Sequence, residues 1–352
     1  MSEIAHATAI PRLTSLSHGG GCGCKIAPGV LAELLRDSPT SPSFADLLVG
    51  RETSDDAAVY RINDEQAIVA TTDFFMPIVD DPFDFGRIAA TNALSDIYAM
   101  GASPLFALAI VGMPINVLPR ETIREILRGG EAVCAEAGIP IAGGHSIDSV
   151  EPIYGLAATG LADPRRIKRN SGARAGDALV LGKPLGVGIY SAALKNGLLD
   201  DNDYRAMVAT ATQLNRPGID LAQLDGVHAL TDVTGFGLLG HLLEICRGSG
   251  LAARIEVSDI PLLPRALSLA ETGAVTGASQ RNWQAYGADV ELVSAPAPVY
   301  RSLLTDPQTS GGLLVACAAD AVAAVLGTFE RLGFAEAAVV GTMIPGVPRV
   351  FA

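Results

Sequence analysis

The sequence predicts a two-domain α/β (α+β) protein. Its 352 residues exceed the length that one hydrophobic core usually organises, and 49% of them are hydrophobic, so the chain can build two cores. Short apolar runs typical of strands alternate with stretches of helical periodicity in both halves. A basic stretch with glycine and serine but no periodicity, residues 164–176, separates the halves and is typical of an interdomain linker.

These patterns divide the chain into three parts. Residues 1–45 are rich in loop-forming residues, with one short helical stretch at 28–36, and we expect a flexible glycine- and cysteine-rich segment that lies outside the core. Residues 46–163 then form an N-terminal α/β domain, and residues 177–352 form a C-terminal α/β domain.

The N-terminal half is predicted to contain two strands, two helices and a further short strand, at 57–60, 67–71, 83–100, 119–138 and 139–142. Gly101 closes the first helix, which places Asn92 and Asp96 four residues apart on one face. Pro119 suits the first turn of the second helix, and Gly138 ends it.

The C-terminal half repeats this alternation. It is predicted to contain a strand, a helix, a strand-turn-helix passage and the start of a closing strand-helix unit, at 178–181, 189–196, 228–247 and 313–316. Cys134 and Cys246 lie on the apolar stripes of predicted helices and Cys317 ends a predicted strand, so we interpret these three as small core residues.

Composition excludes several classes of protein. A formal net charge of -13 argues against a nucleic-acid partner and in favour of bound cations. The longest apolar run, 104–115, is too short and too interrupted by proline and glycine to span a membrane, and no secretory signal is apparent. Five cysteines without the spacing of a disulfide framework predict a cytoplasmic protein.

The loop from Gly19 to Lys25, with the sequence Gly-Gly-Gly-Cys-Gly-Cys-Lys, is the most informative segment. Its glycines permit backbone conformations closed to other residues, and the Lys25 ammonium is expected to lower the pKa of a neighbouring thiol and so favour the nucleophilic thiolate. His18 lies directly before the glycines and could add to this effect. The alternative is a disordered tail whose Cys-x-Cys binds an adventitious metal.

Aspartates recur beside apolar segments. They lie in four settings rich in threonine, serine or asparagine: Thr53 to Asp56, Thr71 to Asp73, Asn92 with Asp96, and Thr231 to Thr234. Mg²⁺ prefers oxygen ligands and is commonly held by a few carboxylates together with substrate phosphates, so the set indicates a metal-nucleotide site. Each aspartate alone is equally typical of a helix cap or a turn.

Two further glycine-containing segments are ambiguous. Residues 143–146, Gly-Gly-His-Ser, follow a predicted strand and could approach a phosphate or ribose, or could form a tight turn; the same holds for 306–312. Two other phosphate signatures are set aside. The G-x-G-x-x-G at 235–240 follows no clean strand, and Gly182-Lys183 precedes a proline where a nucleotide-binding loop has its hydroxyl.

Together these motifs resemble those of selenophosphate synthetase, also called selenide, water dikinase. The similarity extends from about residue 13 to 312 and rests on seven segments in the same order: 17–25, 53–56, 71–75, 83–92, 142–148, 231–241 and 306–312. The resemblance implies an aminoimidazole ribonucleotide synthetase-like fold, in which the N-terminal domain binds ATP and forms a homodimer. It implies the reaction of ATP, selenide and water to selenophosphate, AMP and phosphate.

The resemblance also implies roles for particular residues. The catalytic pair is Cys22, an ordinary cysteine where the family also uses selenocysteine, and Lys25. The Mg²⁺ ligands are Asp56, Asp96 and Asp232. The ATP contacts are Lys25, Thr53, Ser54, Asp55, Asp56, Asp73, Asp96, Gly144, His145 and Ser146. Selenide is expected to arrive free or from a selenium-delivery protein, without nucleic acid or membrane as a partner.

Two other functions compete with this one. Another ATP-using member of the same superfamily, such as a thiamine monophosphate kinase, would lack the loop that contains Cys22 and Lys25. A non-enzymatic carrier of selenium or metal would need only Cys22 and Cys24 and would give the aspartates no role. Selenide-dependent consumption of ATP separates an enzyme from a carrier.

Overall fold

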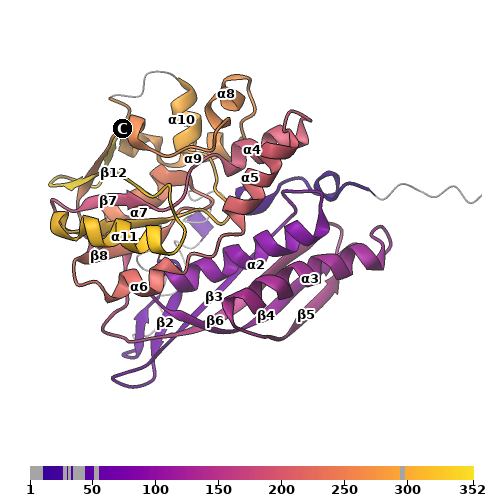
Figure 1. The fold of residues 1–352 in the computed structure, drawn as a ribbon, viewed down its shortest axis with the longest axis horizontal. Coiled ribbons are helices and arrows are strands. Elements are labelled where there is room, and N and C mark those ends of the chain that lie inside the picture. Colours follow the sequence, from indigo (N-terminus) through magenta and orange to yellow (C-terminus); the bar gives the residue numbers. More distant parts are fainter. Residues whose placement is uncertain (1–10, 27–29, 31–32, 35–43, 51–54, 294–297) are drawn as a thin grey trace, which may run out of the picture.

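The computed structural model describes residues 11–26, 30, 33–34, 44–50, 55–293 and 298–352, and it contains two mixed sheets, one in each half of the chain (Figure 1). The first sheet has the order β1-β2-β3-β6-β4-β5, and all its neighbours are antiparallel except the parallel pair β4 and β5. Its strands are β1 Leu47–Val49, β2 Ala58–Arg61, β3 Ala67–Phe75, β4 Ser103–Met113, β5 Ile141–Asp148 and β6 Ile153–Ala162.

The second sheet has the order β10-β13-β9-β12-β7-β11-β8. Its strands are β7 Ala178–Leu181, β8 Val227–Asp232, β9 Ala252–Ile255, β10 Val290–Glu291, β11 Leu313–Cys317, β12 Ala338–Ile344 and β13 Val350–Phe351. Antiparallel pairs again dominate, because only the pairs β10–β13 and β13–β9 are parallel. The mainly antiparallel sheets place the fold in the α+β class.

Helices α2, Pro82–Ala99, and α3, Arg120–Ala137, cover one face of the first sheet. The two helices can approach closely because Gly86 and Gly129 have no side chains. A Cβ at either position would collide with the backbone of the other helix. The C-terminal half contains α4 Val187–Lys195, α5 Asp201–Ala211, α6 Pro217–Gln223, α7 Gly237–Ser249, α8 Ala266–Glu271, α9 Gly277–Tyr286, α10 Pro298–Leu304 and α11 Val322–Arg331. Short 3-10 turns are η1 Leu13–Leu16, η2 Gly21–Cys24, η3 Asn170–Gly172, η4 Val257–Asp259, η5 Gly287–Asp289 and η6 Ala319–Ala321.

Helix α2 lies between the two halves. Asp81 accepts a hydrogen bond from the Asp84 amide and Pro82 occupies the first turn, so the start of the helix is capped. One side of the helix packs on β3 and β6, and it also contacts β8, α5 and α6 of the other half (Figure 1). All residues from Ile88 to Ala99 are buried. The helix therefore belongs to the cores of both halves.

The expectation that the N-terminal segment lies outside the core is wrong for its described part. Leu13 and Cys22 are each only 1% exposed. The Thr14 amide and hydroxyl donate to the Asp80 carboxylate, and the Gly21 amide donates to the Met76 carbonyl. The segment is therefore anchored to the region after β3. The helical stretch expected at 28–36 lies largely outside the described residues.

Most predicted elements are found within a few residues of their expected positions, including α2, α3, β7, β8, α7 and β11. The apolar run at 104–115 largely forms strand β4, which lies between β6 and the edge strand β5, and Cys134, Cys246 and Cys317 are buried as expected. Residues 143–146 are part of strand β5, so the alternative of a tight turn is wrong.

The face of the first sheet that is turned away from α2 and α3 has apolar side chains. Ile68 and Phe74 on β3 and Leu108 on β4 alternate with buried residues and are 36%, 48% and 40% exposed. The edge strand β5 is also exposed from Ala142 to Ile147. No described element of this chain covers that face.

Candidate active site

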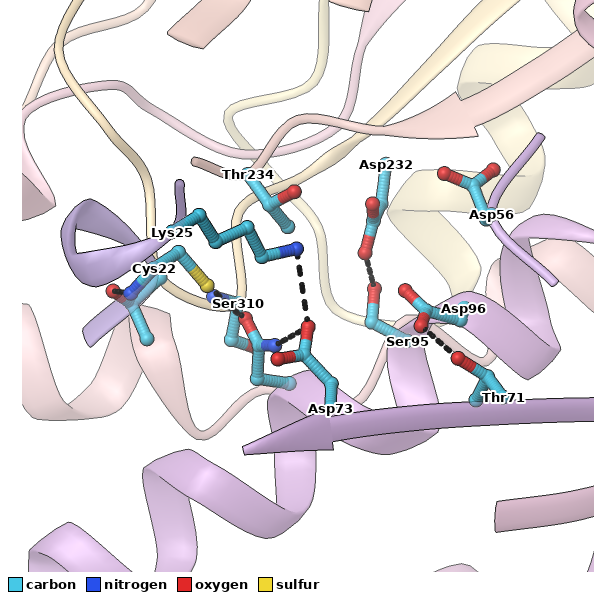
Figure 2. Close-up of polar contacts among 12 residues, drawn as sticks. Cys22, Lys25, Asp56, Thr71, Asp73, Ser95, Asp96, Asp232, Thr234 and Ser310 are labelled. Atoms are coloured by element: carbon cyan, nitrogen blue, oxygen red, sulfur yellow. Dashed lines mark hydrogen bonds and ion pairs between the residues drawn. The ribbon is translucent and has the colours of Figure 1, made fainter. Parts of the chain in front are cut away.

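The predicted catalytic pair and the predicted metal ligands meet where the two halves adjoin (Figure 2). A pocket of about 540 Å³ is lined by Lys25 and three aspartates, Asp56, Asp73 and Asp96. Lys25 follows η2, Asp73 lies on β3 and Asp96 on α2. The first sheet, α2 and the N-terminal segment therefore build one site, here named the nucleotide pocket.

Three carboxylates form the acidic end of this site. One oxygen from each of Asp56, Asp96 and Asp232 lies within 4.8 Å of the others, although the residues come from the loop before β2, from α2 and from the end of β8. Thr71 donates to Asp96, and Ser95 donates to Asp232. This cluster unites both halves of the chain.

The cluster has the properties of a divalent-cation site. Thr231 donates to Asp56 Oδ1 at 2.9 Å, while the buried Asp56 Oδ2 has no hydrogen-bond partner among the described residues. Burial raises the pKa of Asp56 and of Asp96 well above the usual range, and the neighbouring Asp232 charge raises both further. Converging carboxylates that repel one another, with one buried oxygen that lacks a donor, fit a hard cation such as Mg²⁺.

A continuous hydrogen-bonded chain connects Cys22 to Lys25. The Cys22 thiol donates to Asn92 Oδ1 at 3.1 Å, and Asn92 Nδ2 donates to Asp73 Oδ2 at 2.8 Å. The same Asp73 oxygen lies 3.3 Å from Lys25 Nζ, and its negative charge raises the pKa of Lys25. Lys25 is therefore held as an ammonium between the cysteine and the acidic cluster (Figure 2).

Lys25 lowers the pKa of the Cys22 thiol as expected, but the expectation that this makes the thiolate available is wrong. Burial raises the pKa of Cys22 well above its ordinary value, the Asp73 charge raises it further, and the opposing effect of Lys25 is smaller. Because Lys25 is paired with Asp73, its charge is already largely compensated. Cys22 is therefore a neutral thiol that donates a hydrogen bond.

The loop at 306–312 holds the Cys22 segment from the other half. Thr309 Oγ1 accepts from the Cys22 amide at 3.1 Å, and the Ser310 amide donates to Asn92 Oδ1 at 2.7 Å. Ser310 has a φ of 52°, a conformation that is uncommon outside glycine. Gly235 also supports the segment, because a Cβ there would lie 2.7 Å from the Cys22 carbonyl oxygen.

Sequence reasoning missed the roles of Asn92, Thr309 and Ser310. The first was noticed only as a neighbour of Asp96, and the other two lie in a segment that was equally typical of a turn. The polar residues Thr309 and Ser310 beside Gly311 were a signal, but only the folded chain shows that Thr309 and Asn92 contact Cys22 from two directions and that the Ser310 amide contacts Asn92.

Lys183 was excluded as part of a nucleotide-binding loop, but its buried side chain supports the 306–312 loop of the site. It is 1% exposed, and its Nζ donates to the carbonyls of Gln213 and Ser310 at 2.7 and 2.8 Å. Burial lowers the pKa of Lys183 to about 7. It thereby holds the strained Ser310 whose amide orients Asn92.

Replacing Lys183 with methionine should destabilise the protein and change its pH dependence. In the native state its pKa is about 7, below the 10.5 of the free side chain, so the unfolded state binds more protons between these values and native stability rises with pH across that window. The variant should not show this rise. It should also lose about 1–3 kcal/mol of unfolding free energy, because the carbonyls of Gln213 and Ser310 lose their hydrogen-bond donor. Urea titrations at about pH 7 and about pH 9.5 measure both effects; equal pH slopes for wild type and variant would contradict the prediction.

Family models match both halves of the chain. Residues 54–162 match the AIR synthase related protein, N-terminal domain, and residues 174–351 match the AIR synthase related protein, C-terminal domain. The chain is 69% identical to the selenide, water dikinase of Paraburkholderia xenovorans over 340 residues, which cover 97% of this chain and 96% of that protein. The chain belongs to the selenide, water dikinase family. A more distant selenide, water dikinase, from Rhizobium meliloti, is 58% identical over 97% of this chain and 98% of its own length.

Solved structures support the fold of this selenide, water dikinase family member. Thiamine-monophosphate kinase from Stenotrophomonas maltophilia has a TM-score of 0.63 at 20% identity, over 93% of this chain and 96% of that chain. The hydrogenase maturation protein HypE of E. coli has a TM-score of 0.62 at 20% identity, over 83% of this chain and 86% of that chain. At such identities the likeness concerns the fold, and it confirms the predicted two-domain aminoimidazole ribonucleotide synthetase-like class.

In this selenide, water dikinase family member, some of the residues expected to contact ATP lie outside the nucleotide pocket. Gly144, His145 and Ser146 lie on the edge strand β5 and line a different pocket, of about 240 Å³. Asp55 accepts from the Asn170 amide at 2.7 Å and does not line the nucleotide pocket. Thr53 and Ser54 lie outside the described residues.

Proposed function

We propose that this chain makes selenophosphate, AMP and phosphate from ATP, selenide and water, with Cys22 and Lys25 as the catalytic pair. One observation carries the proposal: a buried chain of hydrogen bonds joins the Cys22 thiol to the Lys25 ammonium beside a cluster of three carboxylates. A carrier of selenium or metal has no need for this cluster. Phosphoryl transfer requires positioned positive charge and a coordinated metal, which the site can provide.

We propose Asp56, Asp96 and Asp232 as the ligands of Mg²⁺, because their oxygens converge and one is without a donor. When bound, Mg²⁺ would neutralise charge on the triphosphate. Lys25 is proposed to stabilise negative charge on the transferred phosphoryl group, since Asp73 keeps it protonated and aimed into the pocket. The walls of the pocket then place the nucleotide against the residues of the N-terminal domain.

Asn92 is proposed to position Cys22 and to retain its proton until the substrate enters. Its amide oxygen accepts from the thiol and its amide nitrogen donates to Asp73, so its orientation is defined by both partners. Cys22 can then bind or position selenium only after this hydrogen bond is broken. Cys24, which also lines the nucleotide pocket, receives no catalytic role in this scheme.

We propose that the N-terminal domain, residues 46–163, binds ATP and forms a homodimer, with residues 1–45 as a preceding segment that contributes Cys22 and Lys25 and with residues 177–352 as the C-terminal domain. Support comes from the exposed apolar face of the first sheet, on Ile68, Phe74 and Leu108. Gly144, His145 and Ser146, together with Asp55, Thr53 and Ser54, are retained as proposed ATP contacts.

Selenide is proposed to arrive free or from a selenium-delivery protein, in the cytoplasm. All five cysteines are free thiols, which supports a reducing compartment. Among the described helices, none has both the length and the apolar character needed to cross a bilayer.

Anaerobic phosphorus NMR tests the reaction directly. The protein is incubated with ATP and Mg²⁺, with and without selenide, and selenophosphate, AMP and phosphate should appear together only when selenide is present. Bound selenide without ATP consumption would instead indicate a carrier. ATP consumption that ignores selenide would indicate a different kinase of the same fold.

Leu108→Glu should separate the dimer into monomers, because it puts a charge on the apolar face of the first sheet. Light scattering after size exclusion should show a fall from twice 36.3 kDa to 36.3 kDa for the variant. Leu198→Glu is the matched control, since Leu198 is similarly exposed at 47% but lies in the C-terminal half. A wild-type mass of one chain, or an unchanged dimer in Leu108→Glu, would rule out this interface.

A further inference from the structure

A second pocket, of about 330 Å³, adjoins the Cys22 segment. Gly19, Gly20 and Gly23 line it, together with residues of α4 and of the start of α9, whereas Cys24 and Lys25 line the nucleotide pocket. The two pockets share no lining residue, so the loop at 19–25 separates them. Nothing in the reaction scheme above uses this second pocket.

The charge of the second pocket is opposite to that of the first. Its charged side chains are Lys195, on α4, and Arg281, on α9, and no carboxylate lines it. This is unexpected in a protein with 38 acidic and 25 basic residues. Among the described residues neither cation has a carboxylate partner within ion-pair distance, and Arg281 Nη2 donates only to the Gly23 carbonyl, at 3.0 Å. His18 also lines the pocket, but it is paired with Glu151.

The second pocket leads towards Cys22. A void of about 10 Å³, roughly the size of one water molecule, lies against Cys22. Gly23, Ala278 and Arg281 line both this void and the second pocket, whereas Lys25, Ile26 and Phe236 line both the void and the nucleotide pocket. Gly23 packs between Pro307 and Ala278, since a Cβ at Gly23 would lie 3.4 Å from Pro307 Cγ and 3.5 Å from the Ala278 methyl group. A small shift of Gly23, whose carbonyl Arg281 holds, would connect the pocket to the thiol.

Electrostatics favour this route for an anionic substrate. When ATP lies against Asp56, Asp73 and Asp96, a second anion that enters through the nucleotide pocket must pass both the carboxylates and the triphosphate. The second pocket presents two uncompensated cations instead. A local positive surface in a protein of net charge -13 concentrates anions where the rest of the surface repels them.

We infer that the second pocket is the entry and holding site of the anionic selenium substrate, with Lys195 and Arg281 as the residues that attract it. The inference rests on the proposed function, in which Cys22 and ATP react with selenide. It assigns ATP and selenide to opposite sides of the 19–25 loop, so that they meet only at Cys22.

Alkylation of Cys22 tests the route without requiring turnover. In a Cys24→Ser background, the rates of modification by anionic iodoacetate and neutral iodoacetamide are compared by mass spectrometry of the Cys22 peptide. The ratio of the two rates cancels the thiolate fraction and any general loosening of the loop. Lys195→Glu should lower this ratio about fivefold at low salt, since it reverses the sign of one of the two charges that line the second pocket.

Arg331→Glu is the matched control, because it makes the same change in net charge on α11, away from both pockets. It should leave the ratio unchanged. Mg²⁺-ATP should not protect Cys22 from iodoacetate, since the nucleotide occupies the other pocket. An unchanged ratio in Lys195→Glu, an equal fall in Arg331→Glu, or full protection by Mg²⁺-ATP would each overturn the inference.

Steady-state kinetics then connect the pocket to the reaction. In Lys195→Glu the KM for selenide should rise about fivefold or more, while the KM for ATP stays unchanged. If the chain makes no selenophosphate at all, the proposed function fails, yet the alkylation ratio still reports whether anions enter here. If turnover occurs and neither the ratio nor the selenide KM responds, the pocket assignment fails alone.

Discussion

Replacing Cys22 with serine should lower selenophosphate formation by at least about a thousandfold while leaving the fold intact. A serine hydroxyl can still donate to Asn92 and fits the same buried space, so the contacts that anchor the loop persist. It is neither a comparable nucleophile nor a selenium ligand. Phosphorus NMR measures the product, and thermal unfolding measures the fold.

Cys24→Ser is the control for this result. Cys24 is half-buried and has no hydrogen bond to Asn92, so its loss should reduce activity only mildly. Wild-type turnover in Cys22→Ser would remove Cys22 from the mechanism. Equal losses in both variants would instead favour a site in which two thiols hold a metal or exchange a disulfide.

Removing divalent metal should weaken ATP binding at least about tenfold, or about 1.4 kcal/mol. The triphosphate otherwise faces three converging carboxylates and Asp73, against which Lys25 supplies one positive charge. Asp96→Asn should reduce ATP affinity in Mg²⁺ to the level of wild type in EDTA. Calorimetric titration with and without chelator measures both values.

A stability measurement distinguishes loss of the metal from damage to the fold. Without metal, Asp96→Asn should be at least as stable as wild type, because it relieves repulsion from Asp232 and its carbonyl oxygen can still accept from Thr71. Asp320→Asn, which removes an exposed carboxylate, should leave the effect of EDTA unchanged. Equal ATP affinity with and without chelator in wild type would assign the three aspartates to capping and turns.

Sequence patterns predicted those parts of the fold that depend on interactions between residues close together in the chain, such as the ends of helices. Helix α3 begins after Pro119 and ends at Gly138, whose φ of 79° suits glycine, and both residues were recognisable as helix ends. Strand β4 was noticed only as an apolar run, because it has apolar side chains on both faces: Ala107 is buried, whereas Leu105 and Leu108 are exposed, so the polar-apolar alternation that marks a strand is missing. The same run could have been a helix.

The site was less accessible to sequence reasoning, because it depends on contacts between distant segments. The resemblance indicated Asp56, Asp96 and Asp232 as a set, and their oxygens do converge. The state of Cys22 could not be predicted, since burial and the Asp73 charge raise the pKa of the thiol by more than the neighbouring lysine lowers it. The Cys22 thiol is buried by contacts from both halves of the chain, which a local sequence pattern does not show.

Helix α2 couples the two halves of the protein, so that neither can move without affecting the other. Asn92, Ser95 and Asp96 lie on a helix that both halves bury, and α6 of the C-terminal half comes so close that Gly218 has no room for a side chain against the Tyr98 carbonyl. A hinge motion about this contact would separate Ser95 from Asp232 and dismantle the acidic cluster. The halves are thus cooperative rather than independent, and a nucleotide bound at the cluster should slow amide hydrogen exchange in both sheets at once.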